Sequence, residues 1–214
     1  MAHFVVAVDG PAGSGKSSVS REVARRLGFD YLDTGAGYRA FTFHAMQHPD
    51  LDLAGLIASF DYAIETNPEN PRATLSSVDI STAIRSAQVA GRVSEFASKA
   101  EVRALQLEDA RKRIAASLAP GIVVEGRDIT TAVAPDAQVR VLLTASEEVR
   151  LARRAGEQTE DVQNLSRRDS SDSKVVDFFN PASGVSLIDT TELDFEQSVA
   201  ALIEKIREVQ DGRG

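Results

Sequence analysis

The chain has 214 residues, of which 43% are hydrophobic and 26% charged, as expected for one globular domain with a sizeable core. Its 32 acidic and 24 basic residues leave a net charge of −8, which excludes a general attraction for nucleic acid or anionic membranes. The absence of cysteine excludes disulfides and thiolate metal sites.

The amino-terminal residues lack the cationic segment and the small-residue cleavage site of a secretion signal. No apolar run approaches the ~18 residues that span a membrane. We therefore expect a cytoplasmic protein whose partners are small molecules rather than nucleic acid or membrane. We also expect a monomer, because nothing in the sequence requires an oligomer.

Five short apolar segments predict buried strands, because they are rich in β-branched residues and end at turn signals. These segments are 4–8, 29–33, 122–126, 139–145 and 185–189. Apolar residues at helical spacing predict the helices 17–27, 37–47, 84–118 with a break near Ser98–Lys99, 146–155 and 195–209. Strands that alternate with helices predict an α/β fold with a doubly wound five-stranded parallel sheet. The first strand and the first helix flank the glycine-rich stretch DGPAGSGKSS, which makes the predicted fold one of the P-loop NTPase type.

Two segments differ from this alternation. Residues 48–83 are rich in proline and contain two strand-like pieces, 61–66 and 73–80, around the turn NPENP. They predict a small antiparallel lobe inserted in the main domain. Residues 155–184 are polar and rich in Ser and Asp, which predicts a mobile lid. A single domain, 1–214, would then have a core made of 1–47, 84–154 and 185–214.

The stretch DGPAGSGKSS contains the phosphate-binding pattern G-x-x-x-x-G-K-[ST] between a predicted strand and a predicted helix. Its glycines let successive N–H groups face a phosphate, and the helix amino terminus adds partial positive charge. Lys16 would reach the outer phosphates, Ser17 would ligate Mg²⁺, and Asp9 would orient a metal-bound water. The expected ATP-binding residues are Gly10, Pro11, Ala12, Gly13, Ser14, Gly15, Lys16, Ser17 and Ser18.

Other nucleotide-binding classes fit less well. The chain lacks the N-K-x-D motif of GTPases, and an oligomeric ATPase would show an acidic pair after a later apolar strand. Here Arg127 and Asp128 follow the strand 122–126. An arginine beside an acid at the carboxyl end of a strand suits a second, anionic substrate.

Four further stretches outside the phosphate-binding loop form recognisable motifs: LDTGAGYRA (32–40), VSEFASKAEVR (93–103), VEGRDITTAVAPDA (124–137) and RRDSSDS (167–173). Together with VDGPAGSGKSSVSREVARRLGF and IDTTELDFEQSV, they resemble the bacterial cytidylate kinases, a P-loop nucleoside monophosphate kinase family, along nearly the whole chain. The resemblance implies ATP-dependent phosphorylation of CMP and dCMP, with the inserted lobe over the monophosphate.

The same resemblance implies residue roles. Arg39 and Arg127 would hold the acceptor phosphate beside Thr34, while Ser94, Arg103 and Asp128 would recognise cytosine. Arg168 and Asp172 in the lid would contact the sugar and phosphate of the acceptor. Arg150 would stack on adenine and Arg154 would reach the phosphates. The residues expected to act in catalysis are Lys16, Arg127, Arg154 and Arg168.

Some positions depart from the family pattern and leave alternatives open. Gly37 replaces an apolar residue, Thr130 a glycine, Ala134 an aromatic residue and Val175 a lid arginine. The acceptor is therefore also open to another small phosphate-bearing molecule such as UMP. A nucleotide-binding regulatory protein with weakened catalysis is the other alternative. Without the resemblance, Arg103 and Arg150 would be interpreted as surface ion pairs.

Overall fold

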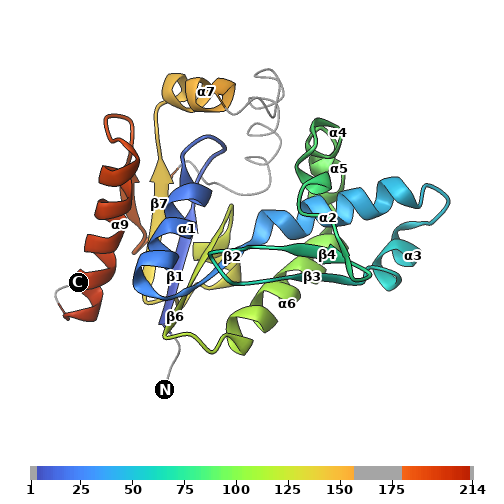
Figure 1. The fold of residues 1–214 in the computed structure, drawn as a ribbon, viewed down its shortest axis with the longest axis horizontal. Helices are drawn as coiled ribbons and strands as arrows, with labels where there is room; N and C mark the ends of the chain where they lie inside the picture. Colours follow the sequence, from blue (N-terminus) through green and yellow to red (C-terminus); the bar gives the residue numbers. More distant parts are fainter. Residues whose placement is uncertain (1–3, 157–179, 213–214) are drawn as a thin grey trace.

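The computed structural model describes residues 4–156 and 180–212, and the statements below concern these residues (Figure 1). A five-stranded parallel sheet with the order β2-β6-β1-β7-β8 forms its centre. The strands are β1 (Phe4–Asp9), β2 (Asp30–Asp33), β6 (Gly121–Gly126), β7 (Val139–Thr144) and β8 (Ser186–Asp189). The predicted five-stranded α/β fold is confirmed, with each strand boundary within one or two residues of its predicted segment.

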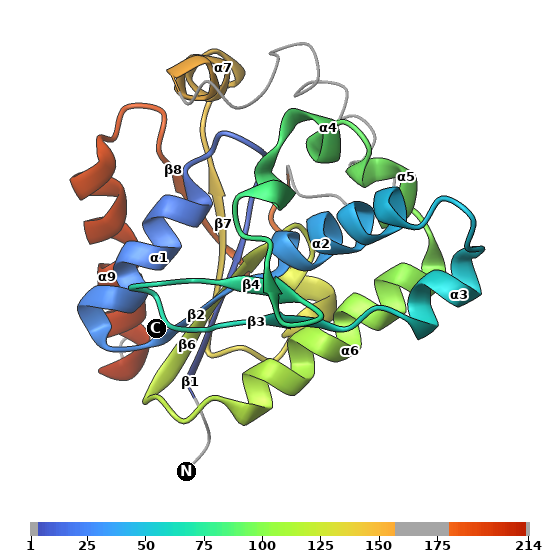
Figure 2. The same ribbon diagram turned by 45° about the vertical axis from the view of Figure 1, so that its right-hand side comes forward.

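Helices cover both faces of the sheet because alternate residues of the buried strands point to opposite sides. Val6 and Val8 of β1 pack with α1 (Lys16–Leu27) and α9 (Phe195–Gln210). Ala7 packs on the other face with α2 (Thr34–Gln47) and α6 (Ala100–Ala116). Figure 2 shows α1 and α9 together on one side of the sheet, and α2 and α6 on the other.

The predicted helix 84–118 is broken as expected at Ser98–Lys99, but its first half is not one helix. It forms the 3-10 turn η1 (Ala83–Arg85) and the short helices α4 (Ala87–Ala90) and α5 (Val93–Ala97). Ser86 interrupts the segment because its backbone is extended, with ψ 151°, and its hydroxyl caps α4 at the Val89 amide. The long helix α6 follows only after the break.

The inserted segment contains α3 (Leu53–Ala58), which was not predicted, and a three-stranded antiparallel sheet β3-β4-β5. Its strands are β3 (Tyr62–Ile64), β4 (Ala73–Leu75) and β5 (Val78–Asp79). The prediction of one strand over 73–80 is wrong. Ser76 and Ser77 have φ of 47° and 67°, the left-handed values of a tight hairpin turn, so the chain reverses there. Neither is the Gly or Asn that usually marks such a turn.

The carboxyl ends of the parallel strands meet at one edge of the sheet. The loop after β1, the start of α2 after β2 and the turn after β6 all lie at this edge, where ligands of such sheets bind. Among the described helices, none is long and apolar enough to cross a membrane.

Candidate active site

The loop between β1 and α1 is packed so closely that glycine is required at two positions. A Cβ at Gly10 would collide with the carbonyl of Leu143, and one at Gly13 would lie 2.6 Å from the Arg150 carbonyl oxygen. Gly13 and Gly15 also have φ of 77° and 88°, which favour glycine. The loop therefore rests directly on β7 and on α7 (Glu147–Gly156).

Two arginines of α7 donate hydrogen bonds to backbone carbonyls of this loop. Arg150 is buried, 7% exposed, and its Nη1 donates to the Ala12 carbonyl at 3.0 Å. Arg153 Nη1 donates to the Ser14 carbonyl at 3.3 Å, and Nη2 donates to the Thr190 carbonyl at 2.8 Å. The sequence singled out Arg150 and Arg154 but missed Arg153, because nothing in the local pattern distinguishes three arginines on one helix.

Lys16 and Ser17, at the start of α1, meet the buried carboxylate of Glu125 at the end of β6. Ser17 Oγ donates to Glu125 Oε1 at 2.8 Å, and Lys16 Nζ lies 3.9 Å from Oε2. The Tyr31 hydroxyl donates to the same Oε1 at 3.2 Å. Burial raises the pKa of Glu125, and the nearby Asp33 raises it further, against the opposing effect of Lys16. Sequence reasoning missed Glu125, although an acid within the apolar strand IVVEG was a usable signal.

Asp33, at the end of β2, lies opposite Glu125 and pairs with two arginines. Arg39 Nη2 donates to Asp33 Oδ2 at 2.6 Å, and Arg85 Nη2 lies 3.5 Å from the same oxygen. Oδ1 accepts from the Ala36 amide at 3.1 Å and so caps α2. Burial favours a higher pKa for Asp33, but Arg39 and Arg85 outweigh it and lower the pKa below its ordinary value.

The turn after β6 carries two of the predicted site residues, Arg127 and Asp128. Arg127 Nη1 donates to the Gly10 carbonyl at 3.1 Å. Asp128 Oδ2 forms an ion pair of 2.7 Å with Arg103 Nη2 of α6. Thr34, the first residue of α2, donates its hydroxyl to the Glu125 carbonyl at 2.9 Å. The acidic partner of Arg103 is thus Asp128 rather than a neighbour on its own helix.

Asp9 has a different environment from the one expected. Its carboxylate accepts hydrogen bonds from the Ile129 amide at 2.6 Å and from both the amide and the hydroxyl of Thr130, at 2.9 and 2.6 Å. These bonds connect Asp9 to the first two residues of the π-helical turn η2 (Ile129–Val133). Burial raises the pKa of Asp9 above its ordinary value, against the effect of these three hydrogen bonds. Few of its acceptor positions stay open for a metal-bound water.

The remaining predicted residues divide into two groups. Ser18 is exposed on α1 and Ser94 is half-buried on α5. Arg168 and Asp172 lie outside the described residues, as do Val175 and the side chain of Arg154. Their predicted roles therefore stay predictions.

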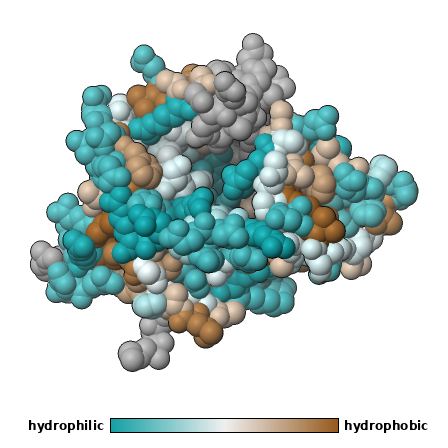
Figure 3. Space-filling model, viewed as in Figure 1, coloured by the Kyte–Doolittle hydropathy of each residue, from teal (hydrophilic) through white to brown (hydrophobic). Residues whose placement is uncertain are grey.

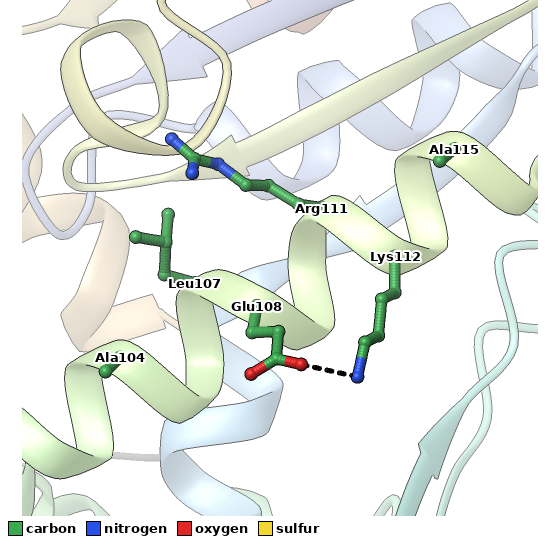
Figure 4. Close-up of a pocket in the computed structure, with 6 residues that line it drawn as sticks. All are labelled: Ala104, Leu107, Glu108, Arg111, Lys112 and Ala115. Carbon is green, nitrogen blue, oxygen red and sulfur yellow. Dashed lines mark ion pairs between the residues drawn. The ribbon is translucent and has the colours of Figure 1, made fainter.

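The surface agrees with a polar site in this region. Figure 3 shows a mostly hydrophilic face that is hollowed between the side formed by α1 and the side formed by α4 and α5. A separate pocket of about 410 Å³ lies on α6 (Figure 4). It contains none of the predicted site residues, and its lining comes from that helix alone: Ala104, Leu107, Glu108, Arg111, Lys112 and Ala115.

A family model described as Cytidylate kinase matches residues 6–208. The chain belongs to the cytidylate kinase family. The cytidylate kinase of Cutibacterium acnes is 42% identical over 215 residues, covering 95% of this chain and 96% of that protein. The one of Streptomyces avermitilis is 37% identical over 215 residues, with 95% and 93% covered. The family predicted from the sequence motifs is confirmed.

Two solved structures share the fold of this cytidylate kinase family member at low identity. A gluconokinase from Sinorhizobium meliloti has a TM-score of 0.53 at 13% identity and covers 99% of this chain and 98% of its own. A shikimate kinase from Bacteroides thetaiotaomicron has a TM-score of 0.51 at 13% identity, with 97% and 98% covered. At such identities the likeness concerns the fold alone.

One departure from the cytidylate kinase pattern has a structural counterpart in α6. Gly37 of α2 faces Gln106, whose amide oxygen occupies the place that a Cβ at position 37 would need. Gln106 is 6% exposed, and its Nε2 has no hydrogen-bond partner among the described residues. The space that an apolar side chain at position 37 would need is thus filled by a side chain from a neighbouring helix.

Proposed function

We propose that this protein transfers the γ-phosphoryl group of ATP to CMP and dCMP. The observation that carries the proposal is the pairing of Asp33 with Glu125 across β2 and β6. One carboxylate holds Arg39, which the family motif assigns to the acceptor, and the other lies beside Lys16 of the phosphate-binding loop. Two cations suited to two phosphorylated substrates therefore flank one pair of strand ends.

The donor side would hold ATP over residues 10–18, with Lys16 on its outer phosphates. The Ser17 hydroxyl and the Glu125 carboxylate are oxygen ligands 2.8 Å apart, which is the chemistry that Mg²⁺ prefers, so these residues fit the ion. When bound, Mg²⁺ would neutralise charge on the phosphates. We assign Glu125 to this site in preference to Asp9, because Asp9 already accepts three hydrogen bonds.

The acceptor side would recognise cytosine by its polar edge. Asp128 would accept a hydrogen bond from the exocyclic amino group, and Arg103 and Ser94 would donate to the ring acceptors. Uracil has a carbonyl in place of that amino group and would leave a desolvated carboxylate without a donor, which is costly. This difference supports CMP over UMP as the substrate.

Phosphoryl transfer requires the protein to position the two substrates and to neutralise the charge on their phosphates. The acceptor phosphate is already an anion at neutral pH, so no side chain needs to act as a general base. Arg39 and Arg127 would hold that phosphate in line with the γ-phosphoryl group. We propose that Arg154 and Arg168 then close on the transferring group and exclude water, which would otherwise hydrolyse ATP.

An assay of ADP release tests the proposal. The protein is given ATP with CMP, dCMP, UMP, AMP, GMP or shikimate, and CMP and dCMP are expected to give the fastest turnover. Turnover with CMP and dCMP no faster than the acceptor-free control would contradict the proposal. Binding of ATP without turnover would instead favour the regulatory alternative. Size-exclusion chromatography tests the expected monomer, and cell fractionation tests the expected cytoplasmic location.

A further inference from the structure

Arg85 is the last residue of η1 and lies where the inserted segment returns to the core. Its Nη2 is 3.5 Å from Asp33 Oδ2, the oxygen that also accepts from Arg39 Nη2 at 2.6 Å. No sequence motif pointed to Arg85. The fold thus brings an arginine from η1 to the predicted phosphate-binding arginine of α2.

The side chains around Asp33 and Glu125 carry more basic groups than acidic ones. One carboxylate, Asp33, serves two guanidinium groups, while the neighbouring Glu125 is taken up by Lys16 and Ser17. The Nε of Arg39 is buried and has no hydrogen-bond partner among the residues described. Since each guanidinium has five N–H donors, a single carboxylate oxygen leaves most of them without a charged acceptor.

The two arginines differ in exposure in a way that suits a ligand entering from solvent. The Arg39 side chain is 18% exposed and that of Arg85 is 59% exposed, whereas the Asp33 side chain between them is 7% exposed. The phosphate of a nucleoside monophosphate is at most a dianion with three terminal oxygens, and several arginine donors match it well. An anion with several oxygens would therefore satisfy the arginine donors at this place.

We propose that Arg85 is a third arginine of the acceptor phosphate site, held next to Arg39 by Asp33. The inference rests on the proposed function, because it assigns the anion to the monophosphate acceptor. Arg85 binds the phosphate from the side of η1, and Arg39 binds it from α2. Asp33 is a positioning residue, since it touches both arginines and not the substrate.

An ion pair of purely structural purpose is the alternative. A pair at 3.5 Å with one exposed partner contributes little to stability, and its loss would not depend on which substrate is bound. A phosphate-binding arginine has a different signature. Its loss weakens binding of the monophosphate but not of the nucleoside or of ATP.

The variant Arg85→Ala is compared with Arg72→Ala. Arg72 is a matched control, because it lies in the adjacent inserted segment, is 44% exposed and pairs with Asp79 at 3.2 Å. Three quantities are measured: KM for CMP, KM for ATP, and the inhibition constant of cytidine against CMP. We expect Arg85→Ala to raise KM for CMP by about tenfold, because a charge-assisted contact is lost. The other two quantities should stay within about twofold, and the effect should shrink in about 0.5 M salt.

Equal losses of CMP and cytidine affinity, or a KM for CMP like that of Arg72→Ala, would overturn the assignment. Thermal melting monitors folding, and Arg85→Gln replaces the alanine variant if that variant does not fold. Failure of the proposed function shows in the wild-type protein. If another monophosphate is the acceptor, the same comparison is made with it and its nucleoside. If no monophosphate is accepted, the assignment falls together with the proposed function.

Discussion

Asp33 and Glu125 lie opposite each other in neighbouring parallel strands, and each carboxylate holds a cation from a different part of the chain. Arg39 donates to Asp33 at 2.6 Å, and Lys16 lies 3.9 Å from Glu125. Their pKa values shift in opposite directions, since the arginines lower the pKa of Asp33 while burial raises that of Glu125. Glu125 therefore costs stability in its ionised form, which a functional site explains.

The first prediction concerns the variant Glu125→Gln. Because the pKa of Glu125 is raised in the folded protein, its ionised form destabilises the fold at pH values above that pKa. The variant should melt about 2–4 °C higher at neutral pH if about 1 kcal/mol is recovered. This gain should disappear as the pH falls to the ordinary value of 4.5 and below, where the carboxyl is protonated in both states. Turnover should fall at least about tenfold, since the charge near the phosphates is lost.

Glu22→Gln is the control for this variant. Glu22 is a half-buried acid of α1 that accepts hydrogen bonds from Arg25 and Arg26, which lower its pKa to about 2. Its replacement should not raise the melting temperature and should leave turnover unchanged. A Glu125→Gln protein that melts lower than wild type at neutral pH would refute the assigned cost of the buried charge.

The second prediction concerns cytosine recognition by Asp128. The variant Asp128→Ala should raise KM for CMP by about tenfold to a hundredfold, because a buried amino group loses its acceptor and Arg103 loses its partner. KM for ATP should change little. Steady-state kinetics with each substrate varied in turn measure both values, and Asp136→Ala on an exposed turn serves as the control. Equal losses for both substrates would indicate a folding defect instead.

The third prediction concerns the packing of Gly37 against Gln106. The family-like variant Gly37→Met should lower the free energy of unfolding by about 1–3 kcal/mol, because its Cβ meets the Gln106 amide. The double variant Gly37→Met/Gln106→Ala should recover much of this loss, since the shorter side chain makes room. Urea unfolding of the two single variants and the double variant measures the coupling between them. Additive effects would show that the two positions do not compete for space.

The fourth prediction concerns the support of the phosphate-binding loop by Arg153. Arg153 donates to the carbonyls of Ser14 and Thr190, so Arg153→Ala should leave both without this donor. We expect a loss of about 1–3 kcal/mol in unfolding free energy and a raised KM for ATP, with KM for CMP nearly unchanged. Arg140→Ala, which removes a hydrogen bond to the Ser183 carbonyl at 3.3 Å, is the matched control. An unchanged KM for ATP would mean that the loop keeps its shape without Arg153.

Local sequence patterns located the strands, most helices and the phosphate-binding loop, because these features depend on neighbouring residues. Apolar alternation marked β1 and β6, and the spacing of Gly10, Gly15 and Lys16 marked the loop. Local patterns failed where the backbone adopted an unusual conformation without glycine, as at Ser76 and Ser77. The motif order also indicated the family, which is confirmed. Through the family it predicted that Arg103 and Asp128 recognise cytosine, which stays a prediction.

Long-range packing sets which charged side chains share a carboxylate. Strand β6 lies between β1 and β2, although about ninety residues separate it from β2 in the chain, and this order sets Glu125 beside Asp33. Long-range packing also places Arg85 next to Asp33, and it places Thr130 where it donates a hydrogen bond to Asp9. Such pairings follow from strand order and helix packing, and these long-range contacts have no counterpart in any short stretch of sequence.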